Sequence, residues 1–463
     1  MKFWNIKLED NCNHCFAKIK KVIILCYLFS NTFFVFAQYN TFSPFSRYGI
    51  GDIQENTLAY QKAMNNVGIA QLTDTTAPAF INISNPATLS SLRLTILDAG
   101  ANYYHTQITN QQNYKVTQKS VNFNSLAIAF PIKKHSGFCF GLLPYSFVGY
   151  QINQDEYVNN IGNINYVYDG SGGLNKVFAA YGFSISKYFR SDSSQGIIKT
   201  LIKNSSFGIN AHYLFGELAQ TAVVNYPSNI TYYHFVNDRR YRINGVSADV
   251  GWQTFLNLKD NKSLLALGWT MSVPSQLKVI NDYIAYNFSY TYYGEKYIVD
   301  TLLYSENEAG KLKLPLSTAL GLSYIVNNQW GINIDGRYTD WKKFQLANDK
   351  VSVKNNFEIS IGGYVQPDRF SMSKGDYWKK VIYRAGIGYN SGYQEYQGKA
   401  VPLYSFSAGV SLPVGLYRAF SALHISAQYA IKGQKNFILR ENILKINIGI
   451  TLNDRWFVKY KYD

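Results

Sequence analysis

Cysteine is scarce in this sequence of 463 residues, which contains four. Three of them, Cys12, Cys15 and Cys26, lie within the first 37 residues. If that segment is removed, Cys139 alone remains and no intramolecular disulfide can form. Cys12 and Cys15 form a CxxC without a second pair, so we expect no metal site.

Catalytic motifs are missing as well. The sequence contains no HExxH, no GxSxG and no phosphate-binding glycine loop. Five histidines follow residue 37, and none of them stands in a recognisable serine or acidic motif: His105, His135, His212, His234 and His424. We therefore predict that the chain is not an enzyme and uses no cofactor.

Long apolar runs are also absent. No stretch of about 20 apolar residues follows residue 37, which excludes a mature protein that crosses a membrane as helices. The N-terminus is typical of an export signal, with Lys18, Lys20 and Lys21 before an apolar segment at residues 22–36. We predict a signal peptide over residues 1–37, with an uncleaved signal anchor as the alternative.

Charge is sparse but strongly biased. Charged residues make up 16% of the sequence, and the formal net charge is +16. Residues 1–37 carry a net +3, so the chain without them keeps +13. We expect an exported chain of this charge to meet anionic lipid headgroups or surface polysaccharide rather than nucleic acid.

Aromatic residues are plentiful, with 39 Tyr, and a period of two recurs along the chain. In the clearest case, polar or small residues separate Leu444, Ile446, Ile448, Ile450 and Leu452. Similar alternation occupies residues 246–253, 330–335 and 404–412, and it predicts β-strands with two unlike faces. Fourteen such strands are predicted, beginning near residues 94, 121, 137, 177, 205, 244, 263, 318, 330, 357, 382, 404, 422 and 444.

A soluble β-sandwich also alternates, so other features must distinguish it from a barrel. Many predicted strands run for ten or more residues, close to the length of a tilted membrane strand. Aromatics stand near strand ends, where interfacial girdles are expected: Trp269, Trp330, Tyr338 and Trp341. Short connections at residues 131–136 and 327–329 contrast with long, polar or Tyr-rich connections at 217–242 and 274–314.

These features predict an all-β protein, a 14-stranded antiparallel transmembrane β-barrel over residues 93–452. Residues 456–462 alternate too, but an even strand number argues against a fifteenth strand, so residues 453–463 are predicted to be a tail. Residues 38–92 lack sustained alternation. We expect them to form a compact hatch with short helices inside the barrel, with Asn85 capping a helix that starts at Pro86.

Asn85, Pro86 and Ala87 resemble the hatch motif of the FadL/OmpP1/TodX family of outer-membrane proteins. Further matches follow in order through two adjacent strands: Leu314-Pro315, Gly321, Tyr324, Trp330, Asp335, Tyr338 and Thr339-Asp340-Trp341. Residues 383–387 and Tyr389 resemble that family's next recurrent strand. The opening at residues 43–49 and Asp454-Arg455-Trp456 depart from the enteric pattern and suggest a divergent branch, of the kind found in Bacteroidota.

The resemblance implies an outer-membrane barrel whose hatch closes the periplasmic side. It also implies passive uptake of long-chain fatty acids or other hydrophobic compounds, with lateral escape into the bilayer. The alternative is a non-transporting FadL-like subunit of a secretion or assembly machine, since the shuttle protein of the type IX secretion system uses such a barrel for partner binding. The Tyr-rich residues 225–241 and 283–304 would then be interfaces, and otherwise they are solvated loops.

Two sites follow from these expectations. Gly141 and Pro144 weaken strand pairing, so we predict an interrupted wall there, with ordinary barrel curvature as the alternative. Arg47 of the hatch is predicted to meet the inward-facing Asp335 or a ligand carboxylate, with a structural ion pair or a solvated arginine as the alternative. A dry pocket inside the barrel would then hold the hydrophobic ligand.

Overall fold

The computed structural model describes residues 41–73, 79–188, 196–227, 232–258, 262–347, 351, 353–369, 371, 374–416, 419–434, 437 and 439–454. The predicted signal peptide at residues 1–37 and the candidate fifteenth strand at residues 456–462 lie outside these described residues.

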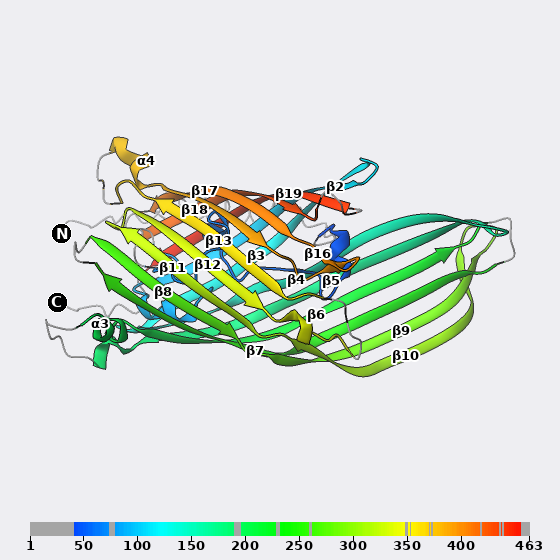
Figure 1. Cartoon of the computed structure of the whole chain (residues 1–463), viewed down its shortest axis with the longest axis horizontal. Coiled ribbons are helices and arrows are strands. Elements are labelled where there is room, and N and C mark those ends of the chain that lie inside the picture. Colours follow the sequence, from blue (N-terminus) through cyan, green and yellow to red (C-terminus); the bar gives the residue numbers. More distant parts are fainter. Residues whose placement is uncertain are drawn as a thin grey trace, which may run out of the picture. The chain divides into compact units, whose positions relative to one another are not determined.

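Fourteen antiparallel strands form a closed barrel, in which β19 pairs with β2 (Figure 1). In order around the barrel they are β2 (Thr95–Asn110), β3 (Lys115–Lys133), β4 (Ser136–Val158), β5 (Gly162–Ser184), β6 (Ser206–Asn225), β7 (His234–Asn257), β8 (Ser263–Ser272), β11 (Ser317–Val326), β12 (Trp330–Thr339), β13 (Asn356–Val365), β14 (Ile382–Asn390), β17 (Leu403–Leu416), β18 (Ala419–Lys432) and β19 (Leu439–Asp454). Each of the fourteen predicted strands corresponds to one of these, which confirms the fold and the strand number. β19 ends at Asp454, two residues beyond the predicted end of the barrel at residue 452.

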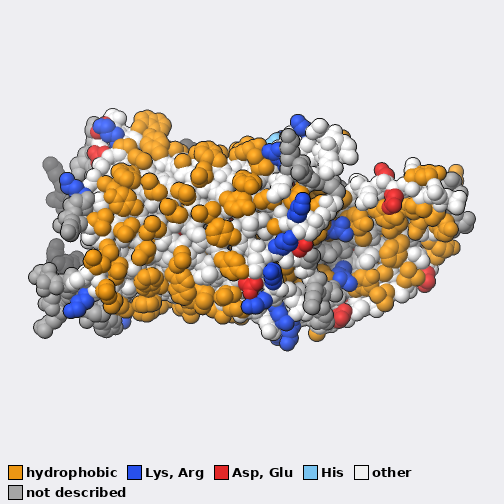
Figure 2. Space-filling model, viewed as in Figure 1, with side chains coloured by type: hydrophobic (Ala, Val, Ile, Leu, Met, Phe, Trp, Pro, Cys, Tyr) orange, Lys and Arg blue, Asp and Glu red, His pale blue; other side chains and the backbone are white. Residues whose placement is uncertain are grey.

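Apolar side chains of the strands face outward and polar side chains face inward. In β19, Ile448 is 52% exposed whereas Asn447 and Thr451 are buried. This is the reverse of a soluble sandwich, and it is the arrangement that a surrounding bilayer stabilises. Figure 2 shows the resulting hydrophobic surface over the barrel wall.

The barrel has a terminal end, where β2 begins and β19 ends, and an opposite outer end, where the chain rises into a taller sheet. The hairpin of β9 (Ser275–Tyr290) and β10 (Lys296–Leu314) continues the wall beyond β8. β7 pairs with β8 over residues 249–257 and with β9 over residues 234–244. We call β9, β10 and residues 143–158, 162–175, 214–225 and 234–244 of β4 to β7 the outer sheet.

The predicted long loops at residues 217–242 and 274–314 are therefore wrong. Among the described residues of those two segments, the chain leaves regular strands at residues 226–227, 232–233, 274 and 291–295. The pattern misled because most residues of β10 and of the first part of β7 are partly or fully exposed whichever face they lie on, so β-forming Tyr, Val and Thr are not sorted there by a period of two. The predicted starts of β5 and β7 are late for the same reason.

The hatch segment, residues 41–92, contains four short elements: η1 (Pro44–Arg47), β1 (Asp52–Ile53), α2 (Ala59–Lys62) and η2 (Pro86–Ser91). η2 contacts β4, β5, β6 and β7, while α2 contacts β17, β18 and β19 on the opposite wall. Figure 1 shows this blue segment running among the strands. The main apolar core joins hatch residues such as Tyr60, Met64 and Leu89 to wall residues such as Phe178 and Ala422.

The remaining short elements lie in connections. They are η3 (Ile185–Tyr188), α3 (Ile197–Lys203), η4 (Trp341–Lys343), η5 (Lys374–Asp376), α4 (Tyr377–Lys380), β15 (Glu395–Tyr396) and β16 (Lys399–Ala400). Trp341, predicted to lie in an aromatic girdle, is instead buried and stacks on Tyr393 with ring centroids 4.1 Å apart. Among the described residues, no helix is long and apolar enough to span a membrane.

Candidate functional site: the hatch and the polar lumen

Asn85, Pro86 and Ala87 lie buried where the hatch meets β7. The Asn85 side-chain oxygen accepts a hydrogen bond from the backbone N–H of Ala87 at 3.0 Å, which caps η2. Its Nδ2 donates to the carbonyl oxygens of Ile69 at 2.8 Å and Trp252 at 3.0 Å. One side chain thus starts the hatch helix, folds the hatch on itself and ties it to the wall.

A row of glycines receives this helix, and sequence reasoning missed it. Gly137, Gly182, Gly208 and Gly251 lie opposite one another across β4, β5, β6 and β7. A Cβ on Gly208 would lie 2.3 Å from the carbonyl carbon of Pro86, and one on Gly251 would lie 2.2 Å from Asn85 Oδ1. Because these four residues have no side chains, η2 packs directly on the backbones of the strands. Only the register, which the sequence does not show, brings the four positions together.

Asp335 binds the hatch, but Arg47 is not its partner. Asp335 Oδ2 accepts hydrogen bonds from the backbone N–H groups of Gly68 at 2.7 Å and Ile69 at 3.0 Å. The Arg47 guanidinium lies over the Tyr168 ring, 4.2 Å from its centroid. The structure therefore does not bring Arg47 and Asp335 together. The Asp335 carboxylate instead accepts its hydrogen bonds from the hatch backbone.

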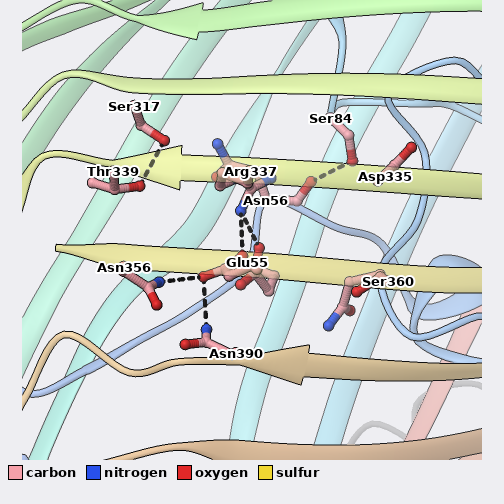
Figure 3. A network of polar contacts seen from close by, with 12 residues as sticks. Glu55, Asn56, Ser84, Ser317, Asp335, Arg337, Thr339, Asn356, Ser360 and Asn390 are labelled. Carbon is pink, nitrogen blue, oxygen red and sulfur yellow. Dashed lines mark hydrogen bonds and ion pairs between the residues drawn. The ribbon is translucent and has the colours of Figure 1, made fainter. Parts of the chain in front are cut away.

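An ion-pair network holds the middle of the hatch to the wall (Figure 3). Arg337 Nη1 of β12 lies 2.5 Å from Glu55 Oε2 of the hatch and 3.5 Å from Glu358 Oε2 of β13. Glu358 Oε1 also accepts hydrogen bonds from Asn356 Nδ2 at 2.8 Å and Asn390 Nδ2 at 2.7 Å. Two carboxylates share one guanidinium, so each acidic side chain keeps a partner inside the barrel.

A second ion pair lies nearer the outer end. Lys432 Nζ of β18 lies 2.5 Å from Asp52 Oδ1 of β1, and it donates to Ser43 Oγ at 3.2 Å. Ser43 Oγ in turn donates to Glu441 Oε1 of β19 at 2.7 Å. Residues 43–55 are thus held by ion pairs at two places, on β12 and on β18.

A cavity of about 250 Å³ lies between these ion pairs. Its charged lining residues are Asp52, Glu55, Lys176, Asp249, Arg337, Glu358, Lys432, Glu441 and Lys445. His212 Nε2, also in the lining, lies 2.6 Å from Asp249 Oδ2. The dry pocket expected inside the barrel is therefore wrong for this cavity, because desolvating so many charges would oppose binding of an apolar ligand.

Lys62 at the end of α2 shows what this environment does to a cation. Burial and the nearby Lys445 ammonium lower the pKa of Lys62 to about 7, although the Glu55 carboxylate opposes the shift. Lys62 therefore loses much of its charge near neutral pH.

The wall opens between β3 and β4. Their pairing runs from Lys133 opposite Ser136 to Leu126 opposite Leu142 and ends there, between Gly141 and Pro144. Beyond that point β3 pairs with β2, and β4 pairs with β5. Residues 146–150 are all buried, so the alternation of the wall is lost where β4 leaves β3.

The hatch covers this gap. Asp52 and Ile53 of β1 pair with Phe147 and Ser146 of β4. The backbone N–H of Gly149 donates to Ser46 Oγ at 3.1 Å, so the contact continues along the strand. The predicted wall site and the first part of the hatch therefore form one structural unit.

One buried hydrogen-bonded chain has catalytic residue types but no access. Ser411 Oγ lies 2.7 Å from His424 Nδ1, His424 Nε2 lies 2.8 Å from Thr451 Oγ1, and Thr451 donates to Asp98 Oδ2 at 2.7 Å. All four side chains are buried, and the rings of Tyr60 and Phe80 pack on His424. Within the described residues, no group of three metal-binding side chains is found either.

Comparison with known proteins identifies the family. The family model described as BamG matches residues 18–463. The chain belongs to the BamG family. A search of curated proteins finds no match.

Solved structures similar to this BamG-family chain are outer-membrane transporters of the FadL type. The Pseudomonas putida toluene transporter TodX is 16% identical, with a TM-score of 0.52 over 88% of this chain and 100% of that chain. The Ralstonia pickettii toluene transporter TbuX is 11% identical, with a TM-score of 0.53 over 87% of this chain and 99% of that chain. A Pseudomonas aeruginosa FadL homologue is 12% identical, with a TM-score of 0.51 over 88% of this chain and 100% of that chain. These likenesses confirm the predicted FadL-like barrel and an outer-membrane type of fold.

Proposed function

We propose that this protein is a partner-binding barrel, a FadL-like subunit of an outer-membrane secretion or assembly machine. The charged lumen carries this proposal. A carrier of hydrophobic compounds needs an apolar cavity, whereas here nine charged side chains line the cavity and the hatch is bonded across it.

The outer sheet supports the same role. Tyr292 and Tyr293 at the tip of the β9–β10 hairpin are 98% and 88% exposed, and Leu302, Leu303 and Tyr304 on β10 are more than half exposed. Exposed apolar and tyrosine side chains on a sheet that stands in water are typical of contact surfaces. The outer sheet contains nine acidic and seven basic residues, in a chain whose net charge is +16. Its acidic balance disfavours anionic surface polysaccharide and favours a protein partner.

Uptake of fatty acids or other hydrophobic compounds is the second candidate, and the gap between β3 and β4 favours it. A hydrophobic molecule that entered at the outer end would leave sideways into the bilayer if residues 52–54 moved off β4. Each buried CH₂ would contribute about 0.8 kcal/mol to retention in the membrane. In this candidate function the polar lumen would serve only to hold the hatch.

Native mass spectrometry of the full-length protein, extracted from its own membrane in mild detergent, distinguishes the two. We expect stoichiometric protein partners and an empty lumen. A barrel that is released alone and carries a fatty acid or hydrocarbon, displaced competitively by added dodecanoate, would overturn the proposal and favour uptake.

A further inference from the structure

A second concave site lies on the outside of the barrel, away from the lumen. It is a cavity of about 440 Å³ in the wall formed by β13, β14, β17 and β18. The surface of a barrel is convex, so a hollow of this size requires a local arrangement of side chains.

Two rows of large side chains form the walls of this groove. One row consists of Ile361, Ile387, Phe406 and Tyr429, which lie opposite one another on the four strands. The other row, two residues nearer the outer end, consists of Ile359, Tyr389, Tyr404 and Ile431. The floor between the rows is backbone at the paired residues Gly388 and Ser405, whose side-chain positions face the lumen, where Ser405 Oγ donates to Asn65 Oδ1 at 2.7 Å. The groove spans four strands, or about 14 Å across three strand spacings.

The position of the groove identifies its surroundings. β14 ends at Asn390 and β17 begins at Leu403, so the row of Tyr389 and Tyr404 lies just inside the outer end of the barrel. Tyrosines at this height are typical of the membrane interface. The groove thus opens toward the acyl chains of the outer leaflet, and its orientation across tilted strands inclines it to the membrane plane.

Lysines lie on the connections at the outer end of the strands that carry the groove. Lys399 is exposed on the β15–β16 hairpin, which connects β14 to β17, and it has no ion pair within the described residues. Lys354 lies beside this hairpin and donates to the carbonyl oxygen of Gly398. The exposed Lys342 is near, because its backbone N–H donates to Asn355 Oδ1 at 3.0 Å. Figure 2 shows Lys and Arg side chains gathered where the hydrophobic surface ends and the outer sheet begins.

We infer that this groove binds one acyl chain of an anionic lipid of the outer leaflet, whose phosphate is held by Lys399 and its neighbours. The apolar groove and the cationic rim lie at the two heights that a lipid tail and its headgroup occupy. Neither feature is used by the lumen or by the outer sheet, so the inference goes beyond the proposed function.

The test uses full-length protein in detergent and dipalmitoyl phosphatidylglycerol, with dipalmitoyl phosphatidylcholine as the zwitterionic comparison. Native mass spectrometry at limiting lipid should show one retained phosphatidylglycerol. Ile387→Trp fills the groove and should lower that retention about tenfold, the equivalent of two lost CH₂ contacts. Ile209→Trp, on the exposed outer face of β6 and away from the groove, is the matched control and should leave it unchanged.

The headgroup is tested separately. Lys399→Gln should lower retention of phosphatidylglycerol about fivefold and leave phosphatidylcholine unaffected. Lys199→Gln, exposed on α3 at the terminal end, is its control. Equal loss of retention in Ile387→Trp and Ile209→Trp would overturn the groove as the binding site. Equal retention of both lipids by the unaltered protein would overturn the anionic headgroup as part of the ligand. If the protein purified from its native membrane instead carries an acyl chain that is covalently attached to another protein, a free lipid is not the ligand and the inference is overturned.

Discussion

At the scale of residues, small and charged side chains hold the hatch in addition to the apolar core that joins it to the wall. Asn85 and Asp335 bind backbone groups, and Gly208 allows the backbone of Pro86 to lie on β6. Such contacts have little tolerance for added atoms. Substitutions there should therefore act on hatch docking before they act on the barrel.

We predict that Gly208→Ala undocks η2, because the new Cβ would lie 2.3 Å from the Pro86 carbonyl carbon. Overpacking of this kind costs about 1–3 kcal/mol. Limited trypsin digestion of the folded barrel should then cleave the hatch segment faster. Gly336→Ala is the control, since a Cβ there meets nothing within 4 Å, and equal digestion of the two variants would contradict the docking role.

A double-mutant cycle should show that Glu55 and Arg337 are coupled. Because both side chains are partly exposed to the cavity, we expect a coupling of about 1 kcal/mol from the thermal unfolding of the single variants Glu55→Gln and Arg337→Gln and the double variant. The same cycle with Asp340 and Lys343, a surface pair at 3.0 Å, should give less. Additive effects at Glu55 and Arg337 would show that the network does not hold the hatch.

Lys62 should make stability depend on pH above neutrality. Its pKa is about 7 in the folded protein and near 10.5 in the unfolded chain, so the unfolded chain binds more protons between those values. Stability therefore rises with pH from about 7 to 10.5, and the rise from this group should vanish in Lys62→Met. Thermal unfolding at pH 7 and pH 9.5 measures the slope, and an identical slope in both proteins would refute the burial of this cation.

At the scale of elements, β1 is the critical piece because it covers the place where β3 and β4 part. It consists of two residues, Asp52 and Ile53, and its pairing to β4 is short. A strand so short depends on the side-chain contacts around it. It is thus the element whose movement would open the wall.

A disulfide between Ile53→Cys and Ser146→Cys should close the gap permanently, in a Cys139→Ser background that removes the buried native thiol. Directly opposed strand residues have Cα atoms about 4.5–5.5 Å apart, within the range that a disulfide bridges. If the protein is a machine subunit, the oxidised and reduced forms should support the same partner binding. Loss of hydrophobic uptake on oxidation, restored by reductant, would instead establish transport through the wall.

At the scale of the whole molecule, the chain combines a membrane barrel with an outer sheet that the barrel does not need for closure. β8 pairs with β7 on one side and β11 on the other, independently of β9 and β10. The hairpin is thus an addition to a complete wall. It has its own exposed apolar surface at Leu302, Leu303 and Tyr304.

Replacing residues 276–313 by a short turn should leave a folded, membrane-inserted barrel that has lost its protein partners. Heat-modifiable migration on gels reports the fold, and co-purification from detergent extracts reports the partners. Tyr292→Ser with Tyr293→Ser should weaken the same partners by at least about tenfold, because exposed tyrosines are frequent hot spots. Tyr157→Ser, at the exposed β4–β5 tip, is the control. It should leave partner binding unchanged if the β9–β10 hairpin is the binding surface.

The sequence by itself determined the barrel, the number of strands and the separate character of the N-terminal segment. A bilayer imposes apolar outer faces on strands of fixed length, and this constraint is local, so it appears as a period of two in segments such as residues 444–452. Above the bilayer the constraint ends, and the pattern no longer distinguished a strand from a loop at residues 274–314.

Only the tertiary structure decided what the hatch touches and what the lumen contains. The glycine row of Gly137, Gly182, Gly208 and Gly251 exists through strand register, and the pairing of Arg337 with Glu55 joins residues 282 positions apart. Such contacts depend on register and on the path of the hatch, neither of which leaves a periodic signal. For that reason the sequence predicted an apolar pocket by resemblance, whereas the folded chain gathers its polar side chains into a charged lumen.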